Sequence, residues 1–144
     1  FLGHSLGGLL ILDLFERHGA SLPPGRVVLL GSPVNGAQAA RRISSWPGMR
    51  ALLGDMPHRQ LVEAPPRVWR QSRELGVIAG TTSLGLGLIT GGFSGPNDGT
   101  VQVEETLLEG RTAELTLPVT HAGLGFSSAV AHQAGSFLTM GRFA

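Results

Sequence analysis

A serine, an aspartate and a histidine in this chain stand in contexts that suit nucleophilic catalysis. Ser5 lies in Gly3-His4-Ser5-Leu6-Gly7-Gly8, which contains the pattern G-x-S-x-G. Such a segment turns a strand sharply into a helix and holds the serine hydroxyl at the apex. We expect a Cβ at Gly3 or Gly7 to clash in this turn. A lone serine is a weak nucleophile, so it needs a base and a group that orients the base.

Candidates for these two partners follow predicted strands. Functional groups of an open α/β sheet gather in the loops after the carboxyl ends of its strands. Asp98 lies in the loop Gly95–Val101, after the third apolar run that reads as a strand, and His121 follows the fourth. These positions predict that Asp98 and His121 meet Ser5 at one edge of the sheet.

Each acidic candidate also has an ordinary structural explanation. Asp98 stands in Pro-Asn-Asp-Gly, which is a strong turn sequence, and a turn role is the first interpretation of that segment alone. Of the three aspartates, Asp13 falls in a predicted helix and Asp55 in an irregular region, so only Asp98 follows a strand. Glu104 and Glu105 are reserve candidates, although their pattern is more typical of an exposed helix start.

Among the five histidines, only His121 follows a strand at the expected catalytic edge. His4 lies inside the turn and is expected to point beside the nucleophile. His18 stands at a helix end, where a cation is mildly favoured. His58 falls in the irregular region, and His132 on the exposed face of the last helix.

Short apolar runs predict the framework that carries these residues. Phe1-Leu2 reads as the end of a strand, Leu6–Arg17 as a helix that closes at Gly19 in a left-handed conformation, and Arg26–Leu30 as a strand buried on both faces. Strand, helix and strand joined by a short loop form a βαβ unit, which implies a parallel sheet.

The second half continues this pattern. We predict strands at Leu75–Ala79 and Ala113–Leu117 and a terminal helix at Ser127–Met140, while Val101–Leu108 is ambiguous. The helix should bury Val130, Ala134, Phe137 and Leu138.

Two irregular segments separate these elements. Residues 34–73 are rich in Pro, Arg and Met and are interpreted as a cap or lid insertion, with a helix at Gly36–Ser45. The Gly- and Leu-rich segment Leu84–Phe93 is interpreted as an apolar acyl-binding wall, although a core or loop role fits its composition equally well.

Composition limits the class of protein. The 144 residues suit a single domain, and 42% are hydrophobic against 15% charged. A net charge of +1 gives no basis for nucleic-acid binding, and the interrupted apolar run Leu75–Phe93 is a poor membrane span. The chain has no Cys, which excludes disulfides and thiolate sites and suits a reducing compartment such as the cytoplasm. The turn lacks the spacing of a nucleotide-binding loop, and no metal or cofactor is expected.

Together these motifs resemble the α/β-hydrolase superfamily, particularly its bacterial lipase- and esterase-like members. Gly3–Gly8 matches the nucleophile elbow, Val27–Pro33 the next strand and its Gly-Ser-Pro end, Pro96–Val101 the acid loop and His121–Leu124 the histidine loop. The order serine, acid, histidine also matches. The likeness covers nearly the whole chain.

The resemblance implies a role for each residue. Ser5 would attack an acyl carbonyl, His121 would move the proton, Asp98 would orient the imidazole, and the N–H of Leu6 would be one oxyanion donor. The implied reaction is hydrolysis of a small-molecule or lipid carboxylic ester through an acyl-enzyme. A thioesterase or acyltransferase would share these residues, and a non-catalytic binding role stays open.

The departure from the family is at the front of the chain. Residues 1–144 correspond to the C-terminal part of the hydrolase domain, so the preceding strands, and the loop that gives the second oxyanion donor, are expected in upstream residues. The elbow strand should then form an exposed sheet edge. We therefore expect the 144-residue piece alone to be poorly folded or weakly active. The sequence does not indicate an oligomeric state.

Overall fold

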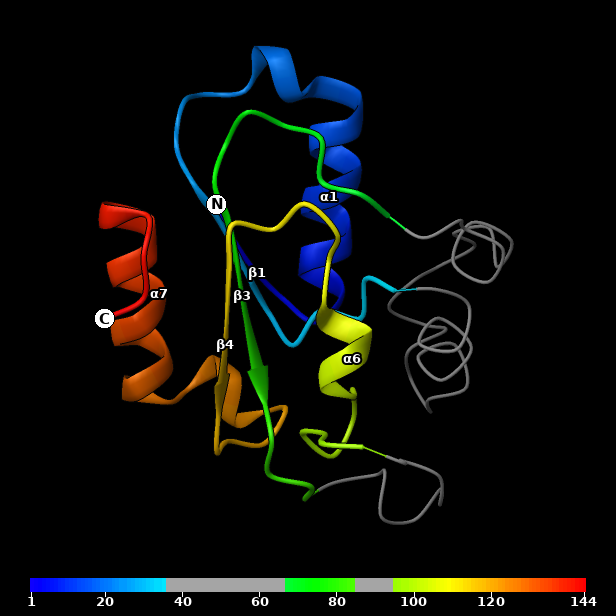
Figure 1. Cartoon of the computed structure of the whole chain (residues 1–144), viewed down its shortest axis with the longest axis vertical. Helices are drawn as coiled ribbons and strands as arrows, with labels where there is room; N and C mark the ends of the chain where they lie inside the picture. Colours follow the sequence, from blue (N-terminus) through cyan, green and yellow to red (C-terminus); the bar gives the residue numbers. More distant parts are fainter. Residues whose placement is uncertain (36–66, 85–94) are drawn as a thin grey trace.

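The strands form a parallel sheet in the computed structural model, which describes residues 1–35, 67–84 and 95–144 (Figure 1). The sheet of the described residues has the order β1-β2-β3-β4, and each strand pairs in parallel with its neighbour. The strands span Leu2–His4 (β1), Val27–Leu30 (β2), Leu75–Gly80 (β3) and Ala113–Leu117 (β4). The expected parallel sheet is therefore confirmed, with boundaries within a residue or two of those predicted.

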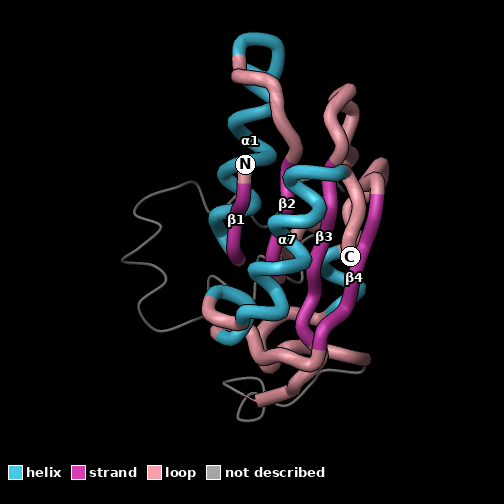
Figure 2. Tube along the Cα trace, turned by 90° about the vertical axis from the view of Figure 1, so that its left-hand side faces the viewer, coloured by secondary structure: helices cyan, strands magenta, loops and turns pink. Residues whose placement is uncertain are grey.

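Helices cover both faces of this sheet. Helix α1 (Leu6–His18) and the short α6 (Val103–Thr106) lie on one side, and α7 (Ser128–Met140) lies on the other (Figures 1 and 2). Two single 3-10 turns, η1 (Gly19–Ser21) and η2 (Gly123–Gly125), follow α1 and β4. Across the described part of the chain, every helix is too short or too polar to cross a bilayer.

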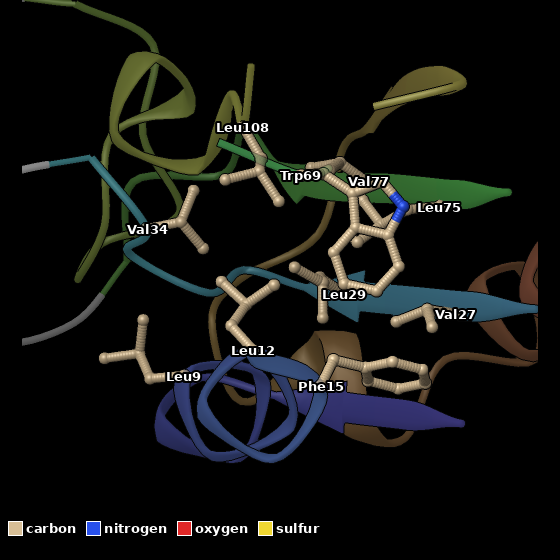
Figure 3. Close-up of a cluster of buried hydrophobic side chains, with 10 residues drawn as sticks. All are labelled: Leu9, Leu12, Phe15, Val27, Leu29, Val34, Trp69, Leu75, Val77 and Leu108. Atoms are coloured by element: carbon tan, nitrogen blue, oxygen red, sulfur yellow. The ribbon is translucent and has the colours of Figure 1, made fainter. Parts of the chain in front are cut away.

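The core has two layers because the residues of each central strand alternate between the two faces. Figure 3 shows the layer between α1 and the sheet, which contains Leu9, Leu12, Phe15, Val27, Leu29, Val34, Trp69, Leu75, Val77 and Leu108. The layer under α7 contains Val28, Leu30, Ile78, Leu124, Val130, Ala134 and Phe137. Every residue of β2 and β3 is buried, as their continuous apolar runs predicted.

The ends of the two long helices close differently. Gly141 ends α7 in the left-handed conformation, with φ 75°. Gly19 keeps right-handed helical angles, so the left-handed closure predicted there is wrong. The chain instead continues into η1, and Arg73 holds this turn by donating to the carbonyl oxygens of Gly19 (3.3 Å) and Leu22 (2.6 Å).

The ambiguous segment after the acid loop contains α6. Its first turn forms a capping box: the Glu105 carboxylate accepts from the N–H of Gln102, 3.0 Å away, and the Gln102 side chain accepts in return. Glu104 is exposed as expected. Glu105 is buried, with 7% of its surface exposed, because this capping turns it inward, so the prediction of an exposed Glu105 is wrong.

Most of the predicted lid lies outside the described residues, as does its Gly36–Ser45 helix. Where the structure resumes, Trp69 is buried in the α1 layer and the neighbouring Val68 bridges to Glu109. The apolar segment Leu84–Phe93 is described only at Leu84, which is exposed.

The strand that carries the elbow is at the edge of the sheet formed by the described residues. Apolar side chains stay exposed on it and on α1: Leu2 has 51% of its surface accessible and Leu10 52%. Whether the 144-residue chain is stable alone remains a prediction.

Candidate active site

Ser5 forms a strained turn between β1 and α1. Its backbone has φ 53° and ψ −120°, and it is the only non-glycine residue with positive φ among the residues that the structure describes. Its N–H donates to the carbonyl of Leu30, 2.9 Å away, at the end of the β1–β2 pairing. Such backbone conformations cost roughly 1–3 kcal/mol and cluster at functional sites.

Two glycines on either side of Ser5, Gly3 and Gly8, let the elbow close, but the predicted pair was Gly3 and Gly7. A Cβ on Gly3 would lie 2.7 Å from the backbone nitrogen of Gly8, as expected for a strand that crowds its own helix. A Cβ on Gly7 would have no neighbour within 4 Å, so the clash predicted there is wrong. The crowded position is Gly8, whose Cβ would lie 2.0 Å from the hydroxyl of Ser32, where α1 approaches the loop after β2.

Asp98 follows β3 and has only 1% of its surface exposed. Its Oδ1 accepts from the N–H groups of Thr100 (2.9 Å) and Val101 (2.7 Å), which makes the turn that Pro-Asn-Asp-Gly predicts. Its Oδ2 lies 2.7 Å from Nδ1 of His121. The turn interpretation and the acid interpretation are therefore compatible, because each uses a different oxygen.

His121 follows β4 and reaches Ser5 across the sheet edge. Its N–H donates to the carbonyl of Asp98, 2.8 Å away, and its Nε2 lies 3.0 Å from Oγ of Ser5. The Oγ1 of Thr120 accepts from the N–H of Gly123, 3.1 Å away, which closes the loop around His121. The side chains of Ser5, Asp98 and His121 thus meet from the ends of β1, β3 and β4.

Gly31, directly after β2, lies close to the side chains of both Asp98 and His121. It has φ 52°, and a Cβ there would lie 3.1 Å from Oδ2 of Asp98, 3.3 Å from Nδ1 of His121 and 2.6 Å from Cδ1 of Leu124. Glycine is required here both for its backbone angle and for space. The one signal of this role in the sequence is a glycine directly after a predicted strand.

His4 contacts His121, and the sequence did not predict this contact. Its Nε2 lies 3.0 Å from the carbonyl oxygen of His121, and the two imidazole rings are 4.8 Å apart between centroids. Burial lowers the pKa of His4 below its ordinary value of 6.5, and the charge of His121 lowers it further. The only sequence signal was its position beside Ser5.

The remaining candidates take no part in this cluster. Glu104 and Glu105 lie in α6, and His18 and His132 are exposed on their helices. His58 lies outside the described residues. Within residues 1–35, 67–84 and 95–144, no three His, Asp or Glu side chains are grouped as metal ligands would be.

The hydrogen bonds of the site define a direction for proton movement. An ionised carboxylate only accepts hydrogen bonds, so His121 presents Nδ1–H to Asp98. Its Nε2 then carries the lone pair and accepts the hydroxyl proton of Ser5. This arrangement can increase the nucleophilicity of the serine by removing its proton as it attacks.

Comparison with solved structures identifies the fold. The chain is similar to a Bacillus licheniformis lipase, BlEst2, in its mature form, with a TM-score of 0.64 and 21% identity over 99% of this chain and 64% of the lipase chain. The propeptide form of that lipase gives the same TM-score and 22% identity, covering 99% of this chain and 36% of the other. The fold is therefore that of the C-terminal part of an α/β hydrolase, and the chain spans less than two thirds of the mature lipase. No protein-family model and no curated protein matches the sequence.

Proposed function

We propose that this chain carries the catalytic residues of a serine hydrolase that cleaves carboxylic esters. One observation carries the proposal: the imidazole of His121 lies between a serine hydroxyl and a buried carboxylate, with Nε2 3.0 Å from Ser5 and Nδ1 2.7 Å from Asp98. The heavy-atom distances suit a nucleophile, a base and a group that orients the base.

The proposed reaction has two stages. Oγ of Ser5 attacks the ester carbonyl while its proton passes to Nε2 of His121, and the imidazolium then protonates the departing alcohol. Water then gives a proton to Nε2 of His121 as it attacks the acyl carbon, the bond between that carbon and Oγ of Ser5 breaks, and the imidazolium returns the proton to Oγ as the acid leaves. Asp98 holds Nδ1–H and stabilises the charged imidazole in both stages.

The helix after Ser5 supports the stabilisation of the oxyanion. Leu6 is the first residue of α1, so its N–H has no partner four residues back in the helix. We assign this N–H one hydrogen bond to the oxyanion. Loss of one such donor typically lowers kcat by about 100- to 1000-fold.

The ester substrate is inferred from chemistry and from fold. The residues suit acyl transfer, and the similar solved structure is described as a lipase. An ester of an apolar acid is therefore the first substrate class to test.

Covalent labelling tests the proposal. A fluorophosphonate probe should label the chain at Ser5, and labelling should be lost in Ser5→Ala and reduced by at least about 1000-fold in His121→Ala, because the base is then missing. Ser21→Ala is the matched control, since Ser21 is exposed and donates to the carbonyl of His18 at the far end of α1.

Unlabelled protein should hydrolyse a p-nitrophenyl ester with a burst of nitrophenol that equals the fraction of chains that the probe labels in a parallel sample. A correctly folded chain that neither reacts with the probe nor hydrolyses the ester contradicts the proposal and favours a binding role.

A further inference from the structure

His4 joins the strand that carries the serine to the loop that carries the base. It is adjacent to Ser5 in the chain and 117 residues from His121, yet its Nε2 lies 3.0 Å from the carbonyl oxygen of His121. The same two segments are linked a second time by Ser5 and Nε2 of His121, at 3.0 Å. The elbow and the histidine loop are therefore held together by two adjacent residues.

The backbone and ring of His121 are then fixed from two sides. The carbonyl of Asp98 accepts from its N–H, and the carboxylate of Asp98 lies against its Nδ1. His4 contacts its carbonyl oxygen and places its own ring against the His121 ring, tilted by 39°. Of the two links from the elbow, the one made by the Ser5 hydroxyl must break whenever that hydroxyl attacks an acyl group. The link made by His4 can persist through the reaction.

We propose that His4 is a positioning residue, whose Nε2–H donates to the carbonyl of His121 and keeps the base in place while Ser5 reacts. The inference rests on the proposed hydrolase function. It adds a residue that touches neither substrate nor oxyanion and acts only through His121.

The protonation state of His4 suits this role. A carbonyl oxygen only accepts, so Nε2 of His4 carries the proton and a neutral ring already suffices to make the bond. Burial and the nearby charge of His121 keep the pKa of His4 below its ordinary value, which favours the neutral ring, while the bond to the His121 carbonyl and the carboxylate of Asp98 act in the opposite direction. A neutral neighbour does not oppose the positive charge that His121 acquires during acyl transfer.

Three substitutions separate the hydrogen bond from the ring contact. His4→Ala removes both, His4→Phe keeps an aromatic ring without a donor, and His4→Gln places an amide donor near the position of Nε2. His132→Ala is the matched control, since His132 is exposed on α7. Each variant is compared with the parent chain for p-nitrophenyl ester hydrolysis, fluorophosphonate labelling and amide hydrogen exchange.

A displaced base should lower kcat and leave substrate binding intact. Because misplacement by about 1 Å can cost about 100-fold, we expect kcat and the labelling rate to fall about 10- to 100-fold in His4→Ala and His4→Phe, with KM within about twofold of the parent. His4→Gln should restore kcat to within about threefold. Equal losses in the Gln and Ala variants would overturn the role of the hydrogen bond.

Amide hydrogen exchange tests the positioning role of His4 independently of enzymatic activity. The N–H of His121 bonds to Asp98 and that of Leu124 bonds to Thr120, so both report on the histidine loop. Loss of one hydrogen bond should speed their exchange by about 2- to 10-fold in His4→Ala and His4→Phe, but not in His4→Gln, while exchange in β3 stays unchanged.

The outcomes distinguish the two proposals. A correctly folded parent chain that is not labelled contradicts the hydrolase function, and exchange at His121 still decides whether His4 holds the loop. A labelled parent with unchanged labelling and exchange in His4→Ala overturns the positioning role alone.

Discussion

Asp98 binds His121 at two points, because its Oδ2 lies 2.7 Å from the imidazole Nδ1 and its carbonyl oxygen accepts from the His121 N–H at 2.8 Å. The other carboxylate oxygen, Oδ1, accepts from the N–H groups of Thr100 and Val101. One aspartate therefore shapes its own loop, positions the backbone of the next loop and orients the imidazole ring of His121.

Asp98→Asn should separate the chemical role of Asp98 from its structural role. The side-chain oxygen of the introduced asparagine can still accept from Thr100 and Val101, but its NH2 group would face Nδ1 and favour the wrong tautomer of His121. If Asp98 is the acid that orients His121, kcat for ester hydrolysis should fall by about 10⁴-fold, as it does in a well-characterised Ser-His-Asp protease, with the melting temperature nearly unchanged.

Asp98→Ala is the control for this prediction. It also removes the turn, so both kcat and the melting temperature should fall. If the Asn variant keeps activity within about tenfold of the parent, Asp98 is a turn residue and not the acid.

Burial of His4 should make the folded chain less stable in mild acid. Its folded-state pKa is lowered below 6.5 by burial first and then by His121, while Asp98 and the bond to the His121 carbonyl oppose this. Above 6.5 the ring is neutral in both states. As the pH falls below 6.5, the unfolded chain binds the proton more readily, so the free energy of unfolding falls until the pH passes the lowered pKa.

Urea unfolding at pH 7 and pH 5 measures this effect. The parent should lose more stability between these two pH values than His4→Gln, which has no titratable ring at this position. The same pH dependence in both proteins would show that His4 does not contribute to the acid sensitivity.

Gly8 and Gly7 are adjacent, and their replacement by alanine should have opposite effects. A Cβ on Gly8 would lie 2.0 Å from Oγ of Ser32 and 2.6 Å from its Cβ, so Gly8→Ala must displace α1 or the loop after β2. Overpacking of this kind typically costs about 1–3 kcal/mol. Gly7→Ala meets no atom within 4 Å and should be neutral or stabilising by up to about 1 kcal/mol.

Chemical denaturation of the two variants gives this comparison directly. Ser32→Gly in the Gly8→Ala background should recover part of the loss, because it removes both clashing atoms. Similar stability of the Gly7 and Gly8 variants is the result that contradicts the predicted contact.

Gly31→Ala should damage the site as well as the backbone. The new methyl group would press on Asp98, His121 and Leu124 at a position with φ 52°. We expect the fluorophosphonate labelling rate to fall at least about 10-fold, together with a loss of stability of roughly 1–3 kcal/mol from the strained backbone.

Gly25→Ala controls for backbone strain alone. Gly25 has φ 148°, but no atom lies within 4 Å of a Cβ built there. Its replacement should lower the melting temperature and leave the labelling rate of the folded protein unchanged. Equal labelling in both variants would argue against close packing of Gly31 under the histidine.

Residue patterns in the sequence correctly predicted the strands and the loops that follow them. The continuous apolar runs of β2 and β3 marked strands buried on both faces, and the loops after β3 and β4 pointed to Asp98 and His121 because parallel strands end at a common edge. The side chains of Ser5, Asp98 and His121 meet as predicted, and their catalytic roles stay proposals.

The remaining features depend on contacts between distant parts of the chain. Gly8 is crowded by Ser32, and His4 meets the carbonyl of a residue 117 positions away. No periodicity or composition encodes such pairings, so only the assembled fold could show them.

The strand order of the sheet has a consequence for when the site forms during folding. Ser5 follows β1, Asp98 follows β3 and His121 follows β4, while β2 lies between β1 and β3. The three side chains meet only after β2 and β3 have paired with both neighbours, and such non-local pairing is slow compared with helix formation. During refolding, the recovery of helical structure should therefore precede the recovery of reactive Ser5, which would make the serine a late reporter of the completed sheet.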